Sequence, residues 1–248
     1  MSLSFYKRYV HYIIIFAVER KILWQMKKDI SGKSNLDISK IITPLFFPLV
    51  LWIVHLLALI FNEDLTKLGL LPRNLTGLLG IFTSPLIHGD FSHLISNTIP
   101  LIILGWVIFT FYPRTSYLVF LLVYFMTGLL VWIFGREVYH IGASGIVYGF
   151  VSFLFFSGLF RRDNKSIALA LVITFLYGGL VWGMFPGWKG ISWESHFFGA
   201  VSGLLAAYLF RNIDPPSKKY DWEDEPDDFD VKDLEVSYDP EKNKFNNL

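Results

Sequence analysis

Residues 142–160 have the sequence GASGIVYGFVSFLFFSGLF, in which the short start Gly142 to Gly145 leads into a long uncharged apolar run. Runs of about 17 to 25 apolar residues can cross the hydrocarbon core of a bilayer, which is about 30 Å thick. The run at 144–160 is the fourth of six such segments; the others lie at roughly 41–61, 93–112, 115–134, 166–186 and 195–210. None has Asp, Glu, Lys or Arg in its interior, as the cost of inserting charged groups predicts.

The overall composition supports the same conclusion. The chain has 248 residues, of which 53% are hydrophobic, and a mean hydropathy of +0.46, which is too apolar for an ordinary soluble domain. Lipid offers no hydrogen-bond partners, so a spanning segment must satisfy its own backbone, and helices do this. We therefore expect an all-α membrane protein with a bundle of six transmembrane helices. The sequence has no cysteine, which excludes disulfides, cysteine nucleophiles and thiolate metal sites.

Charge and composition divide the chain into three parts. Residues 1–40 are basic and contain a short apolar stretch, which favours an amphipathic helix on the membrane surface over a signal peptide. Residues 41–212 form the six-helix membrane domain. Residues 213–248 are acidic and polar, and we expect a disordered tail. Eighteen of the 22 Lys and Arg residues fall on the side of the amino terminus if there are six spans, which places both termini in the cytoplasm.

The connection between the first two spans, at about 62–92, is long and rich in leucine. Connections of this length are usually structured or functional in compact proteins. We expect it to form short helices that dip into the outer leaflet on the external side.

A serine and a histidine at the beginnings of two spans, Ser144 and His196, could form a nucleophilic dyad. At 1.5 Å per residue, Ser144, His196 and Asn97 lie about 24, 21 and 22 Å from the cytoplasmic ends of their spans, and so at one depth. Ser144 shares a helix face with Tyr148, at i and i+4. Glycines spaced four apart on both helices would let the helices approach closely; these are Gly145, Gly149, Gly199 and Gly203.

Other polar residues have simpler interpretations. His55, in the first span, is expected at a helix interface with a hydrogen-bond partner. Asp90 is expected to cap the second span. His140 and Glu194 are expected in external loops, without the spacing of a metal site.

Three motifs together resemble the rhomboid family of intramembrane serine proteases over residues 41–212. These are G-x-S-G at Gly142 to Gly145, H-x-x-x-N at His93 to Asn97, and a histidine followed by spaced glycines, beginning at His196. The resemblance implies a rhomboid-type bundle in which Ser144 is the nucleophile and His196 the general base and then acid.

The resemblance also implies roles for the neighbouring residues. His93, Asn97 and the Ser144 amide would form the oxyanion hole, and Tyr148 would stack on the imidazole of His196. The sequence departs from the better-known bacterial pattern at Ser84, where an additional histidine often lies, and in lacking a Trp-Arg pair in the external loop. His88 matches a second histidine of the pattern.

The function expected from these features is an endopeptidase that cuts transmembrane protein substrates near their external ends. The alternatives are a catalytically silent relative that binds membrane clients and a small-solute transporter, for which intramembrane charge or broken-helix repeats would be expected. The expected partners are such substrates and the lipid bilayer, with no nucleic acid, cofactor or metal; the sequence does not indicate an oligomeric state. We expect a bacterial inner membrane, with an organellar membrane as the alternative, and an active site open to the external side.

Overall fold

Six long helices run through the residues that the structure, a computed structural model, describes: 38–187, 190–214, 236–239 and 244–247. They are α2 (Ile38–Ile60), α4 (Phe91–Phe111), α5 (Ser116–Phe134), α6 (Ser144–Arg161), α7 (Asn164–Tyr177) and α8 (Trp193–Phe210). The 3₁₀-helix η4 (Gly178–Met184) continues α7. The first and last residues of each helix lie within about three residues of the predicted bounds, except that the segment predicted at 166–186 is divided between α7 and η4. The prediction of an all-helical membrane domain is confirmed.

Five helical segments in this described part are long and apolar enough to cross a membrane: α2, α4, α5, α6, and α7 with η4. The protein is therefore an integral membrane protein. The remaining helix, α8, has 18 residues, but its first turn contains Glu194 and His196, which make its composition less apolar. The count of six spans stays a prediction.

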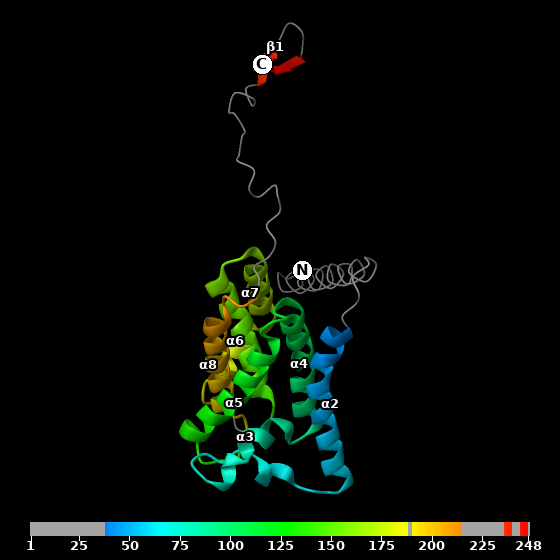
Figure 1. The fold of residues 1–248 in the computed structure, drawn as a ribbon, viewed down its shortest axis with the longest axis vertical. Helices are drawn as coiled ribbons and strands as arrows, with labels where there is room; N and C mark the ends of the chain where they lie inside the picture. The colour runs from blue at the N-terminus through cyan, green and yellow to red at the C-terminus, as the bar shows by residue number, and fades with distance from the viewer. Residues whose placement is uncertain (1–37, 188–189, 215–235, 240–243, 248) are drawn as a thin grey trace, which may run out of the picture.

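Helix α6 lies at the centre of the bundle and contacts α4, α5, α7 and α8 (Figure 1). Its buried side includes Ile146, Phe150, Phe153 and Leu154, which form the main core with residues of α4, α5 and α8. Helix α2 lies at the edge of the bundle, where it packs against α4. Helix α6 is therefore held by neighbours on several sides.

The connection between α2 and α4 folds into short helices at one end of the bundle (Figure 1). They are η1 (Leu65–Leu68), η2 (Thr76–Leu78), α3 (Gly80–Thr83) and η3 (Ser84–Leu86). The hydroxyl of Tyr124 on α5 donates to the carbonyl of Phe82, which ties α3 to the bundle. The prediction of short helices is confirmed, and their depth in the membrane stays a prediction.

Two short strands, β1 (Val236–Asp239) and β2 (Lys244–Asn247), pair antiparallel within the acidic tail. The amphipathic helix predicted in residues 1–40 and most of the predicted disordered tail lie outside the described residues. Both stay predictions.

Candidate active site

Ser144 is the first residue of α6, and a sharp turn of the chain places it there. Gly142 has φ +104°, a conformation that favours glycine, and its N–H donates to the carbonyl of Ser84 at 2.9 Å. A side chain at position 142 would also meet the imidazole of His93, with Cβ only 2.6 Å from Nε2. The glycine is therefore required both by the turn and by the close approach to His93.

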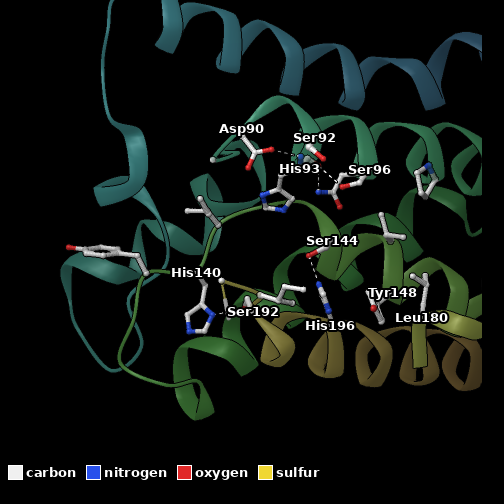
Figure 2. A pocket seen from close by; sticks show the side chains of 18 of the residues that line it. Asp90, Ser92, His93, Ser96, His140, Ser144, Tyr148, Leu180, Ser192 and His196 are labelled. Carbon is white, nitrogen blue, oxygen red and sulfur yellow. Dashed lines mark hydrogen bonds between the residues drawn. The ribbon is translucent and has the colours of Figure 1, made fainter. Parts of the chain in front are cut away.

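His196 meets Ser144 from the first turn of α8. Its Nε2 lies 2.8 Å from the Oγ of Ser144, which is hydrogen-bonding distance. The rings of Tyr148 and His196 are stacked, with centroids 4.1 Å apart and planes 7° from parallel. Figure 2 shows the serine and histidine pointing toward one another from α6 and α8. The structure thus brings together the three residues that the sequence analysis placed at one site.

The spaced glycines face each other across the α6–α8 interface. A Cβ added to Gly199 would meet the carbonyl of Gly145, and one added to Gly203 would meet the carbonyl of Gly149. Contacts this close leave no space for a side chain, so the backbones of α6 and α8 touch directly. This contact holds Ser144 and His196 within reach of each other.

The candidate oxyanion residues line the same cavity as the dyad. The cavity has a volume of ≈ 1070 Å³, and His93 and Asn97 of α4 face it with Ser144 and His196. The side-chain amide of Asn97 donates to the carbonyl of His93 at 2.9 Å, which uses one of its two N–H groups. Asp90 caps α4 by accepting from the N–H of His93 at 2.8 Å, as the sequence analysis predicted.

His88 supports the turn before Ser144 through a hydrogen bond to the backbone. Its Nε2 accepts a hydrogen bond from the N–H of Ala143 at 3.4 Å, and its ring meets that of His93 edge to face at 5.0 Å. Burial, and to a lesser extent the nearby His93, lowers the pKa of His88 to about 4. The imidazole is therefore neutral at ordinary pH. His55 packs edge to face on Phe91 between α2 and α4, the helix interface expected for it.

An ion pair between a buried glutamate and a half-exposed arginine fixes the start of α8, and here one expectation was wrong. Glu194 lies in the first turn of α8 and is only 1% exposed, rather than in an external loop. The reason is that Ser192 caps the helix, which therefore begins two residues before the predicted segment. Both carboxylate oxygens of Glu194 accept from the guanidinium of Arg136.

His140 extends this network, in the loop where it was expected. Its Nδ1 lies 2.5 Å from the Oγ of Ser192, and its Nε2 lies 3.1 Å from the carbonyl of Arg136. A carbonyl can only accept, so Nε2 carries the proton and the hydroxyl of Ser192 donates to Nδ1. Burial lowers the pKa of His140, which favours the neutral imidazole. The network holds the chain on both sides of the dyad, from the loop before α6 to the cap of α8.

One contact of the dyad was missed by the sequence analysis. The Nδ1 of His196 lies 2.9 Å from the backbone carbonyl of Gly183 in η4. Every residue except proline has the same backbone groups, so no side chain in the sequence marks this contact.

Comparison with known proteins places this site in a family. Residues 76–213 match the family model of the rhomboid domain, a region that runs from η2 to the end of α8 and contains every site residue described above. An uncharacterized protein of Mycobacterium tuberculosis (strain H37Rv) is 34% identical over 186 residues, which cover 71% of this chain and 76% of the relative. An uncharacterized protein of Mycobacterium leprae is 33% identical over 187 residues, covering 72% of this chain and 73% of the relative.

Proposed function

The chain belongs to the rhomboid family, and we propose that it is an intramembrane serine endopeptidase that hydrolyses peptide bonds in or near transmembrane segments of its substrates. The observation that carries the proposal is the 2.8 Å contact between Ser144 Oγ and His196 Nε2. That contact lies in a cavity large enough for a peptide segment, beside an imidazole held by Tyr148.

In the proposed reaction, Ser144 Oγ attacks the carbonyl carbon of the scissile peptide while His196 Nε2 takes the hydroxyl proton. The tetrahedral oxyanion accepts hydrogen bonds from the Ser144 N–H at the start of α6, from Asn97 and from His93. Each such donor contributes about 10²- to 10³-fold to the rate. The positive end of the α6 dipole acts in the same direction.

Collapse of this intermediate breaks the C–N bond, and His196 gives its proton to the leaving amine. Ser144 is then esterified with the carbonyl side of the substrate. A water molecule attacks the ester, His196 takes its proton, and release of the acid product regenerates the serine hydroxyl. Serines on the cavity wall, Ser92 and Ser96, make this part of the cavity polar enough to hold that water.

We place α8 as the sixth span, both termini in the cytoplasm, and the site open to the external side of a bacterial inner membrane. Ser144 and His196 lie in the first turns of their helices, whereas the cations Arg161 and Arg211 lie at the opposite ends of α6 and α8. Cationic side chains are enriched in cytoplasmic connections, which supports this orientation. The relatives found in mycobacteria support a bacterial membrane.

The test is cleavage of a transmembrane substrate by the full chain reconstituted in liposomes, together with labelling by a fluorophosphonate probe. We expect wild-type protein to release fragments and to be labelled, and Ser144→Ala to do neither. Ser157→Ala is the matched control, because it makes the same change near the opposite end of α6. Undiminished cleavage by Ser144→Ala would refute the assignment. A folded wild-type protein that captures substrates without labelling or cleavage would instead be a catalytically silent client-binding protein.

A further inference from the structure

The contact between His196 and Gly183 determines which nitrogen of the imidazole carries the proton. A backbone carbonyl can only accept a hydrogen bond, so the Nδ1 of His196, 2.9 Å from the carbonyl of Gly183, must be the protonated nitrogen of the neutral ring. The Nε2 is then left with a lone pair, and it is this atom that meets Ser144 Oγ. The neutral ring is therefore set up to receive the proton of the serine hydroxyl.

In soluble Ser-His-Asp proteases, an aspartate performs this task at Nδ1. The carboxylate nearest in this sequence, Glu194, occupies the same helical turn as His196 but is bonded through both oxygens to Arg136. The hydrogen bond at Nδ1 comes instead from η4, a segment that belongs to neither α6 nor α8.

A side chain at position 183 would require its neighbours to shift. A Cβ added there would collide with the hydroxyl of Tyr148 and would lie 3.2 Å from the Nδ1 of His196. A larger residue would push η4 away from the imidazole and remove the carbonyl from hydrogen-bonding range. Gly179, four residues earlier and in the same 3₁₀-helix, has no heavy atom within 4 Å of an added Cβ.

We propose that Gly183 is a positioning residue of the dyad, whose backbone carbonyl fixes the tautomer and the orientation of His196. This inference rests on the proposed endopeptidase function. It makes η4 a third contributor to the catalytic arrangement and makes the basicity of Nε2 dependent on η4 staying docked against Tyr148. The neighbouring residues Tyr177 and Leu180 line the cavity, whereas Gly183 contacts the ring from the side away from the serine.

The test compares Gly183→Ala with Gly179→Ala in the full chain reconstituted in liposomes. We expect Gly183→Ala to lower kcat by about 10-fold or more with little change in KM, since the hydrogen bond is lost at the base and not at the substrate. Gly179→Ala should keep the wild-type rate. Adding Tyr148→Phe to Gly183→Ala removes the hydroxyl that the new methyl group meets, and should restore part of the lost rate.

A second measurement is independent of turnover. The ¹⁵N NMR spectrum of the ring of His196, taken at a pH where the ring is neutral, should show an Nδ1–H tautomer in wild type and a mixed population in Gly183→Ala. A wild-type rate together with an unchanged tautomer in Gly183→Ala would overturn the inference, as would an Nε2–H tautomer in wild-type protein. If wild type shows the Nδ1–H tautomer but cleaves no substrate, the proposed function fails while the positioning role of Gly183 stands.

Discussion

Helices α6 and α7 follow each other in the chain and are both apolar enough to span a membrane, yet they are packed very differently. In the apolar span of α6, 61% of the residues are buried inside the protein. In the stretch from Asn164 to Met184, which forms α7 and η4, 6% are buried. Helix α6 supplies Ser144 and Tyr148 to the dyad, whereas η4 supplies the carbonyl of Gly183. The nucleophile thus lies on the most buried of these spans, and the acceptor behind the base on the least buried.

The difference arises from small residues rather than from hydrophobicity. Helix α6 has Gly145, Gly149 and Gly158 at positions where a Cβ would strike a neighbour, while α7 presents mostly larger aliphatic side chains such as the exposed Leu171. In lipid, where apolar side chains are equally well solvated by the membrane, close packing depends on such small residues. A span can therefore be more apolar than its neighbour and still be less buried.

The largest effect should come from disrupting the close packing of α6 against α8. Gly199→Ala places a methyl group against the carbonyl of Gly145, which is backbone and cannot move aside alone. We expect a loss of about 3 kcal/mol in the free energy of unfolding, as for a severe overpacking substitution, together with loss of cleavage. Unfolding in detergent micelles measures the first and liposome cleavage the second.

The matched substitution in the less buried stretch of α7 and η4 is Gly178→Ala. Its added Cβ meets only the methyl group of Thr174, at 3.8 Å. Its stability should match wild type within about 0.5 kcal/mol, the usual range for exposed substitutions. Equal losses in both variants would show that the difference in burial between α6 and α7 has no energetic consequence.

Acid should destabilise the surroundings of α6, because burial lowers the pKa of two histidines there: His88, which bonds the turn before Ser144, and His140, in the loop that leads to this turn. Burial lowers the pKa of His88 from 6.5 to about 4, so between these two values the unfolded chain binds a proton that the folded protein does not. The contribution of His88 to the free energy of unfolding is therefore fully present above about pH 6.5. It decreases by roughly 3 kcal/mol as the pH falls toward about 4. The sequence has no histidine between residues 141 and 195, so α7 and η4 make no such contribution.

His88→Gln tests this assignment, since glutamine can accept the hydrogen bond from Ala143 but does not titrate. The free energy of unfolding of wild type and variant is measured from about pH 7 to about pH 4. The variant should show a shallower decline, with the remaining slope due to other groups, among them His140. Parallel curves for the two proteins would contradict the assignment to His88.

Two Arg–Glu pairs provide a smaller contrast at the cavity end of the bundle. The side chain of Glu194 is 2% exposed in its pair with Arg136, whereas that of Glu137 is 76% exposed in its pair with Arg73. Glu194→Gln should cost about 1 to 3 kcal/mol of stability, less than for a fully buried pair because Arg136 is itself half exposed. Glu137→Gln should cost less than about 1 kcal/mol. Similar losses in the two variants would show that burial does not set the strength of these pairs.

The sequence was sufficient to predict most of what surrounds α6. The apolar segments, the facing glycines and the pairing of Ser144 with His196 all depend on side-chain types whose physical consequences are local and strong. The cap at Asp90 was predictable for the same reason, since a carboxylate directly before an apolar run satisfies the first N–H groups of a helix.

Three features could not be found in this way. The start of α8 was placed too late because Glu194 looks like a loop residue until its partner Arg136, 58 positions away, is known. The change from α7 to η4 occurs at Gly178 and Gly179, whose low helix propensity permits but does not require it. The carbonyl of Gly183 has no signature in the sequence, because its role depends on where the backbone lies in the folded protein.

The smallest predicted effect is at Tyr148, the residue of α6 that lies against both His196 and η4. Its ring stacks on the imidazole, while its hydroxyl is the group that an added Cβ at Gly183 would meet. Tyr148→Phe keeps the ring and should lower kcat by less than about 3-fold, whereas Tyr148→Leu loses a stacked aromatic pair of about 0.5 to 1.5 kcal/mol and should lower it by about 2- to 12-fold. Liposome cleavage assays of both variants measure the difference. If Tyr148→Phe is as slow as Tyr148→Leu, the hydroxyl rather than the ring holds the base, and the packed helix acts on His196 through η4 instead of directly.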